Sequence, residues 1–176
     1  MEKEIVLRIQ QSRWVPADEI FIFLTDYVSL FTLGILIIIA LRVFYFKKDP
    51  PYYFYLSTLS LLISASITHL IKWLVHRPRP YQNSPFIHSL TSGGGWSFPS
   101  GHTAEVFTLV FSLWFLYKNP SLQSAILLWA LFIAYTRIAF GVHYPSDILG
   151  GIAIAVFSVY VSKKILKKWH SFSSGF

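Results

Sequence analysis

Two histidines in this sequence have neighbours that suit phosphate chemistry. His102 closes the run Phe98-Pro99-Ser100-Gly101-His102, and His143 follows Arg137 and precedes Asp147. Histidine rings serve in covalent and acid–base catalysis, and a carboxylate can hold such a ring in its productive orientation. An arginine binds phosphate oxygens through its planar fork of donors. These residue types in this order indicate a site for phosphate transfer.

A second group of cations lies upstream of the histidines. Lys72 is followed after six residues by Arg79 and a proline. A phosphate monoester needs several preorganised donors while its charge redistributes in the transition state. We therefore expect Lys72, Arg79 and Arg137 to bind the phosphate. Ser100 is expected to cap a helix whose free N–H groups also face the anion, with Gly101 allowing close backbone approach.

The rest of the chain is more apolar than is usual for a soluble protein. Hydrophobic residues make up 54% of the 176 residues, charged residues make up 13%, and mean hydropathy is +0.52. Ionisable residues are costly inside a membrane, so the polar motifs stand out as functional. We find no linker or internal repeat and expect a single membrane-embedded domain, residues 1–176. Cysteine is absent, which excludes disulfides and thiolate metal sites.

Apolar stretches of the length that a bilayer requires recur along the chain. We expect about five transmembrane helices, at residues 27–46, 52–74, 101–117, 121–140 and 146–163. Residues 1–20 mix charged and apolar side chains and are expected to form an amphipathic interfacial helix. Residues 75–99 form the one long loop. The predicted fold is an all-α, polytopic membrane helix bundle with an N-terminal amphipathic helix.

Basic residues are unevenly divided between the two faces that this topology creates. Eight of the fifteen Lys and Arg lie on the face that carries the C-terminus: Arg42, Lys47, Lys48, Lys118, Lys163, Lys164, Lys167 and Lys168. The positive-inside rule then places the C-terminus in the cytoplasm and the long loop outside. The same distribution accounts for the net charge of +7, so nucleic acid is not expected as a partner.

The topology also brings the motif residues together. Lys72 ends the second expected span, and residues 100–102 open the third. Arg137 ends the fourth span, and residues 143–147 open the fifth. All of them fall on the outer face, although the charge argument made no use of them.

Three motifs of this chain together resemble the signature of the type 2 phosphatidic acid phosphatase family: Lys72 with Arg79-Pro80, Pro99-Ser100-Gly101-His102, and Arg137 with His143 and Asp147. That family comprises integral-membrane lipid phosphatases related to vanadium haloperoxidases. The motifs cover residues 72–147. The chain departs from the family pattern at Thr136, where serine is frequent, and in having five expected spans where many relatives have six.

The resemblance implies a role for each residue of the site. His143 is the nucleophile that forms a phosphohistidine, and Asp147 orients its ring. His102 protonates the leaving oxygen and then activates water. No cofactor and no metal ligand are implied, because cationic side chains surround the phosphate.

The resulting hypothesis is a bacterial inner-membrane enzyme that dephosphorylates a membrane lipid at the outer leaflet, with its site facing the periplasm or cell exterior. Candidate substrates are undecaprenyl diphosphate, lipid A 1-phosphate, phosphatidylglycerol phosphate and phosphatidic acid. Two alternatives stay open: a lipid-to-lipid phosphotransferase, and a non-catalytic protein that binds or transports anionic lipid. The bilayer and the lipid are the expected partners, and no obligate protein partner is evident.

Four polar residues near the motifs lie outside the matched positions. Glu105 lies one helical turn after His102. It is expected either to tune His102 or pair with a site arginine, or else to be a structural hydrogen-bonding group or to line a wet cavity. Asp26 poses the same question. Arg77 and His76 are expected to contact lipid headgroups.

Overall fold

Helices account for all the regular structure in the part of the chain described here. The computed structural model describes residues 1–91, 94–114, 116 and 118–173, and side chains as far as residue 168. The main helices are α1 (Glu2–Ser12), α2 (Asp18–Asp26), α3 (Val28–Ala40), α4 (Pro51–Val75), α5 (Gly101–Leu113), α6 (Pro120–Ala139) and α7 (Pro145–Ser173). Short 3₁₀ turns occupy Val15–Ala17 and Pro80–Gln82, and a π-helical segment, Leu41–Tyr45, continues α3. The all-α prediction is confirmed.

Proline and its neighbours set where several helices begin. Pro51, Pro120 and Pro145 each open a helix, where the missing N–H costs nothing and the fixed φ suits the first turn. Asn119 caps α6, since its Oδ1 accepts from the N–H groups of the first turn. These three helices therefore begin within one residue of the positions that the sequence predicted.

Four of the helical segments are long and apolar enough to cross a membrane: Val28–Tyr45, Pro51–Gln82, Pro120–Ala139 and Pro145–Lys168. The remaining expected span, residues 101–117, corresponds to α5. Its 13 residues give a length of about 20 Å, against a hydrocarbon core of about 30 Å. Residues 115 and 117 of that expected span lie outside the described residues.

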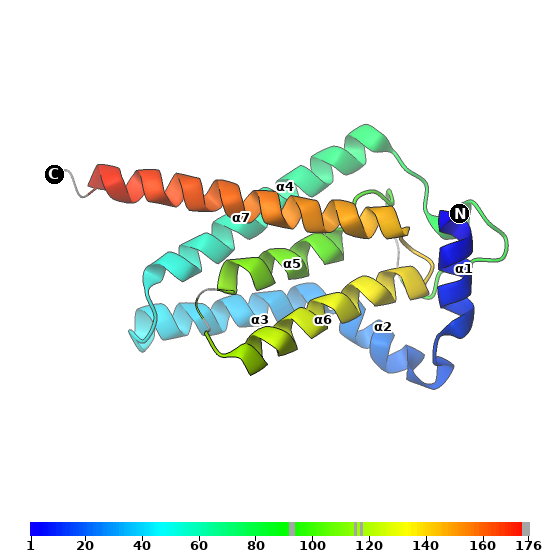
Figure 1. Cartoon of the computed structure of the whole chain (residues 1–176), viewed down its shortest axis with the longest axis horizontal. Coiled ribbons are helices and arrows are strands. Elements are labelled where there is room, and N and C mark those ends of the chain that lie inside the picture. The colour runs from blue at the N-terminus through cyan, green and yellow to red at the C-terminus, as the bar shows by residue number, and fades with distance from the viewer. Residues whose placement is uncertain (92–93, 115, 117, 174–176) are drawn as a thin grey trace.

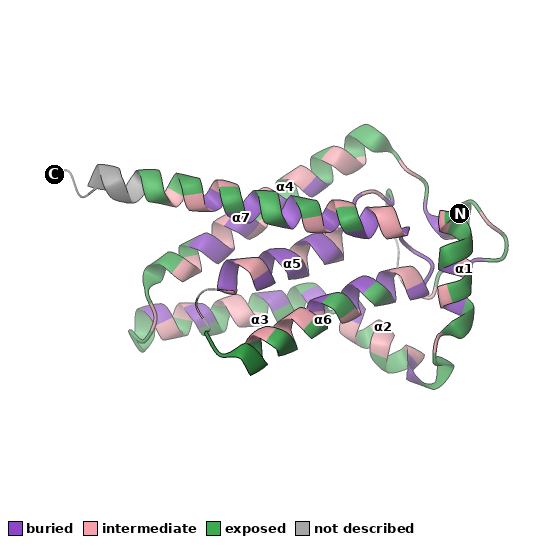
Figure 2. Cartoon of the chain, in the orientation of Figure 1, coloured by how far each residue is buried: buried purple, intermediate pink, exposed green. Residues whose placement is uncertain are grey.

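The short helix α5 forms the centre of the bundle. It packs against α3, α4, α6 and α7, and Figure 2 shows it buried over most of its length. The outward faces of the surrounding helices instead expose large apolar side chains such as Leu30, Leu62 and Phe157, as expected where lipid replaces water. A helix so enclosed need not itself reach both membrane surfaces.

Small residues let α4, α5 and α7 approach closely. Ser57 and Ser112 are buried where α4 meets α5, and the Ser112 hydroxyl donates to Ser57 at 3.0 Å. A Cβ built on Gly151 of α7 would lie only 2.8 Å from the carbonyl oxygen of Ser100. Small residues at such crossings permit van der Waals contact between backbones in a membrane bundle. The crossing at Gly151 sets the start of α7 beside the start of α5.

Helix α1 lies across one end of the bundle (Figure 1). The predicted amphipathic helix is present, but it ends at Ser12 and a turn separates it from α2. Its apolar side packs on the protein's own loops: Val6 is fully buried in a cluster with Ile87 and Tyr144. Helix α1 is therefore a cover over the loops at this end.

Candidate active site

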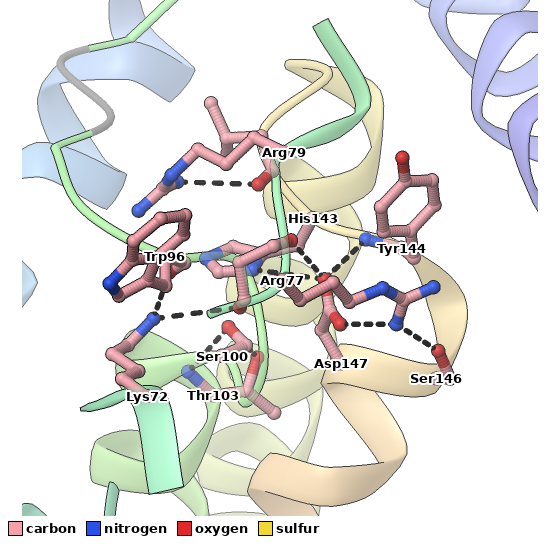
Figure 3. A network of polar contacts seen from close by, with 12 residues as sticks. Lys72, Arg77, Arg79, Trp96, Ser100, Thr103, His143, Tyr144, Ser146 and Asp147 are labelled. Atoms are coloured by element: carbon pink, nitrogen blue, oxygen red, sulfur yellow. Dashed lines mark hydrogen bonds and ion pairs between the residues drawn. The ribbon is translucent and has the colours of Figure 1, made fainter. Parts of the chain in front are cut away.

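The ends of α4, α5, α6 and α7 meet under α1 with the loop of residues 76–100 (Figures 1 and 3). Side chains from these segments line one cavity of about 670 Å³, among them Lys72, Arg79, Gly101, His102, Arg137 and His143. The structure therefore brings these six expected site residues to one cavity, and their roles stay predictions. Ser100 and Asp147 are buried just outside the lining.

Backbone carbonyls hold the Arg79 guanidinium. Its Nε donates to the Gly95 oxygen at 3.0 Å, and its two Nη atoms donate to Gly94 at 2.6 Å and to Val142 at 3.2 Å. Among the described residues, no carboxylate forms an ion pair with it. Carbonyl dipoles orient the guanidinium without cancelling its charge. Arg79 thus presents a buried, fixed positive charge at the cavity.

Lys72 and Arg137 bring two more cations to the same cavity. The Lys72 ammonium donates to the carbonyl oxygens of Trp96 and Ser97. Arg137 is 1% exposed, donates to Thr25 at 3.1 Å and lies 3.8 Å from the Asp26 carboxylate. Its Nε is buried without a hydrogen-bond partner in the described part of the chain. An unmet buried donor is costly, so this N–H is available to an anion.

His143 is buried with its two ring nitrogens in different surroundings. Its Nδ1 lies 3.3 Å from Oδ2 of Asp147, which leaves Nε2 for the cavity. Burial lowers the pKa of His143 to about 3, although the hydrogen bond with Asp147 opposes that shift. The ring is therefore neutral at pH 7, the state that a nucleophile requires.

Asp147 is surrounded by donors in a fully buried position (Figure 3). Arg77 donates to its Oδ1 at 2.7 Å. Oδ2 accepts from the Tyr144 N–H at 2.8 Å and from the Ser97 hydroxyl. With both oxygens occupied, the carboxylate cannot turn away from His143. Sequence analysis missed Arg77 and Ser97 in this role.

The start of α5 is built as the sequence predicted. The Ser100 hydroxyl accepts from the Thr103 N–H at 3.4 Å and from the Thr103 hydroxyl at 2.9 Å, which makes Ser100 the N-cap. Gly101 and His102 follow in the first turn and line the cavity. The N-terminal end of a helix attracts anions through its N–H groups and dipole, so it adds to the field of the cations.

Gly141 fixes the backbone two residues before His143. Its φ is +70°, and a Cβ there would lie 2.6 Å from the His88 oxygen and 3.0 Å from Nε2 of Gln10. Only glycine meets both demands without a shift of the neighbours. The turn that precedes His143 therefore packs directly on the 76–100 loop and on α1.

Glu105 lines the same cavity one turn further along α5. Its Oε2 accepts from the Ser29 hydroxyl at 2.8 Å. No arginine pairs with it in the described part of the chain. Of the alternatives drawn from the sequence, the geometry matches the hydrogen-bonding group in a polar cavity.

The expectation that Arg77 contacts lipid headgroups is wrong. Arg77 is bound on one side by Asp147 and on the other by Glu2, at 2.6 Å. No sequence pattern links Glu2 to a residue 75 positions away, so the pairing was not predictable. His76 is exposed and packs edge-on against Trp96, and its headgroup contact stays a prediction.

The PAP2 superfamily profile matches residues 54–171 of this chain. All the residues that line the cavity fall within that range except four on α3: Ser29, Thr32, Leu33 and Leu36. The fold of this chain also resembles solved structures over nearly its whole length. Aquifex aeolicus LpxE superposes with a TM-score of 0.78 and 26% identity, covering 92% of this chain and 93% of that one.

Two further relatives differ in how much they share. Lipid A 4′-phosphatase of Bacteroides thetaiotaomicron is 38% identical over 78 residues, which are 44% of this chain. This chain spans only 35% of that relative's length. Undecaprenyl-diphosphatase BcrC of Bacillus subtilis is 27% identical over 139 residues, covering 79% of this chain and 69% of the relative.

Proposed function

The chain belongs to the PAP2 superfamily, and on this premise we propose that it removes a phosphate from a membrane lipid through a phosphohistidine intermediate. One observation carries the proposal: Lys72, Arg79, Arg137 and both histidines line the same cavity. A site that only bound an anion would need the cations but not a neutral buried histidine backed by a carboxylate. The relatives named above, a lipid A phosphatase and an undecaprenyl-diphosphatase, support the same class of substrate.

The proposed reaction has two steps that share the cationic pocket. In the first, Nε2 of His143 attacks phosphorus, the bond to the lipid oxygen breaks, and protonated His102 gives its proton to that oxygen. In the second, neutral His102 takes a proton from water, the water oxygen attacks phosphorus, and the P–N bond breaks. Inorganic phosphate leaves and both rings return to their starting state. Asp147 stabilises the charge on His143 while the phosphoryl group is attached.

Lysine, arginine and helix N–H groups supply the stabilisation of the transferring phosphoryl group in this scheme. Among the described residues, no three His, Asp or Glu side chains gather as metal ligands would. The positive groups around the phosphate are side chains of the chain itself: Lys72, Arg79 and Arg137.

The shape of the cavity favours an amphiphilic substrate. Beyond the cations it extends along α3 and α4, where Leu33, Leu36, Leu61 and Leu62 are among the lining residues. A tail in this part of the cavity places the phosphate at the level of the helix ends. Each methylene transferred from water contributes about 0.8 kcal/mol, so a lipid phosphate is expected to have a much higher kcat/KM than glycerol phosphate.

The proposed substrate lies in the outer leaflet, because the basic residues gather at the opposite end of the bundle. The cysteine-free chain allows a direct test with single cysteines. A cysteine at the exposed Ser89 should react with an impermeant reagent in intact cells. A cysteine at the exposed Lys48 should react only after the membrane is opened. The reverse pattern would move the site to the cytoplasmic side.

The deciding experiment measures phosphate release by detergent-purified protein from a panel of lipid phosphates and diphosphates at equal surface fraction. The protein should release phosphate, and His143→Ala should release none. Reactions with a labelled substrate, quenched in alkaline detergent, should trap a phosphoenzyme in the parent only, and its label should be stable to base and released by acid. Label that appears in a second lipid without free phosphate would identify a phosphotransferase. Tight lipid binding without turnover would support the lipid-binding alternative.

A further inference from the structure

We propose that Glu2 of α1, acting through Arg77, positions Asp147 for the reaction of His143. This inference rests on the proposed function, since it assigns a role relative to the catalytic histidine. It makes α1 part of the catalytic apparatus and not only a segment that lies on the membrane surface. Glu2 and Arg77 are positioning residues, because neither lines the cavity.

The contacts form one chain from α1 to the reacting ring. Glu2 Oε2 accepts from Arg77 Nη2 at 2.6 Å, and Arg77 Nη1 donates to Asp147 Oδ1 at 2.7 Å. Asp147 Oδ2 in turn lies 3.3 Å from His143 Nδ1. The two hydrogen bonds of Arg77 have the short length of charge-assisted pairs, which are directional. Each member therefore fixes the next one.

The second oxygen of Glu2 holds the helix that carries Asp147. Glu2 Oε1 accepts from the Ser146 N–H at 3.0 Å, in the first turn of α7. Burial would raise the pKa of Glu2, but hydrogen bonds from Ser146 and Arg77 outweigh it and hold the pKa below its usual range. Glu2 is thus ionised at neutral pH and satisfies an unpaired N–H of α7.

Arg77 is held too tightly to be a mobile surface charge. Besides its two carboxylates, its Nη1 donates to the Ser146 hydroxyl at 2.6 Å, and its guanidinium stacks 4.0 Å from the ring centre of Tyr144. The two carboxylates offset its charge, so it adds little attraction for a phosphate. Its planar fork instead joins α1 and α7 at fixed separation.

Helix α1 is anchored independently of Glu2, so the carboxylate is delivered to a defined place. Val6 is fully buried. Gln10 donates to the carbonyl oxygens of His88 and Ala139, and its Oε1 accepts from the His88 N–H. Lys3 donates to the Asn83 oxygen at 3.0 Å. These contacts tie α1 to the 76–100 loop and to the C-terminal end of α6, and a change confined to Glu2 should leave the helix in place.

The test compares Glu2→Gln with Glu4→Gln in full-length protein purified through a C-terminal tag. Glu4 is on the same helix, but its partner is Arg8, with both side chains mostly exposed. Glu2→Gln should lower kcat about tenfold with KM changed less than twofold, because a misplaced Asp147 affects chemistry and not lipid binding. Glu4→Gln should match the parent in both constants.

A double-mutant cycle shows whether Glu2 acts through Arg77. Arg77→Gln should lower kcat more than Glu2→Gln does, and the double variant should be no slower than Arg77→Gln alone, since coupled residues are not additive. Arg77→Lys keeps a charge between the carboxylates and should recover part of the loss. A merely structural role would lower the melting temperature in proportion to activity and would not spare KM.

The outcomes separate this inference from the proposed function. A parent protein without phosphate release from any lipid would refute the proposed function itself. An active parent whose Glu2→Gln variant is folded and has unchanged kcat would overturn the inference. Additive losses in the double variant would also overturn it. If Glu2→Gln fails to fold, Arg77→Lys against Arg77→Gln decides the question by the same split between kcat and KM.

Discussion

The His143 ring has a carboxylate on its Nδ1 side and cations on its cavity side. The carboxylate is paired with a charged partner, whereas the cations are held mainly by neutral groups. On the Nδ1 side lies Asp147, whose oxygens accept from Arg77, Ser97 and the Tyr144 N–H. On the cavity side lie cations held mainly by neutral carbonyl and hydroxyl oxygens: Lys72, Arg79 and Arg137. We call the Asp147 side the closed side, because its charge is already paired. We call the cavity side the open side, because its cations can still bind an anion.

Two arginines separated by one proline, Arg77 and Arg79, lie on opposite sides of the ring. Arg77 lies between two carboxylates and serves the closed side. Arg79 donates to three carbonyls and serves the open side. Residue type and position in the sequence are nearly the same, yet the partners differ in charge. The role of a buried cation is therefore set by what compensates it.

The largest effect is expected from the closed side. Asp147→Asn keeps the shape of the side chain but loses the charge that orients and stabilises the His143 ring. We expect kcat to fall about 10³- to 10⁴-fold with KM nearly unchanged. Steady-state kinetics in mixed micelles measure this, with Asp49→Asn at the far end of the bundle as control. A loss below tenfold would mean that His143 does not depend on this carboxylate.

A smaller effect of a different kind is expected from the open side. Arg137→Gln removes a donor that faces the phosphate, and kcat/KM should fall about 10²- to 10³-fold. Inhibition by vanadate should weaken in parallel, because the inhibitor uses the same donors. Arg8→Gln, an exposed arginine on α1, is the matched control. Unchanged vanadate inhibition would place Arg137 outside the anion site.

The buried ring between the two sides should make stability depend on pH. The pKa of His143 is lowered to about 3 in the folded protein, against about 6.5 when unfolded. Between these values the unfolded state binds more protons, so stability is lost as the pH falls from about 6.5 toward 3.

His143→Gln removes this contribution to the pH dependence. The melting temperature of the variant should therefore fall less steeply than that of the parent over the same pH range. His88→Gln, at an exposed position, should keep the parent slope. Parallel slopes for parent and His143→Gln would show that the ring gains a proton without cost.

Removal of metal ions is expected to have no effect on activity. Because side-chain cations occupy the open side, overnight dialysis against EDTA should leave kcat/KM within the error of the assay. Added magnesium or zinc should not raise it. A loss restored by one of these ions would require a metal among the groups that bind the phosphate.

Sequence alone predicted the fold and the open side because both follow from the order of the motifs along apolar spans. Lys72, Arg137 and His143 fall at span ends, and an alternating topology places those ends together. On the closed side, the sequence predicted the carboxylate but not the residues that hold it. Asp147 was found at a spacing of four from His143, whereas Glu2 meets Arg77 through tertiary packing of α1 that leaves no periodic signal.

The expected span at residues 101–117 differs from the structure, because α5 is short and enclosed by other helices. The apolar pattern of residues 101–117 predicted a membrane-crossing helix, and α5 ends at Leu113. Nine of its thirteen residues are buried by neighbouring helices. Apolarity in this segment reflects contact with protein on all sides, and composition does not distinguish that from contact with lipid.

Substitutions at Gly141 should abolish activity for a different reason than substitutions at His143. Any side chain there meets α1, the 76–100 loop and an unfavourable φ at once, although Gly141 is not among the residues that line the cavity. A selection that scores only growth or activity would therefore rank Gly141 beside His143 as intolerant. A parallel selection for protein abundance would divide the two: variants at Gly141 would be depleted from the membrane, and those at His143 would accumulate as inactive protein.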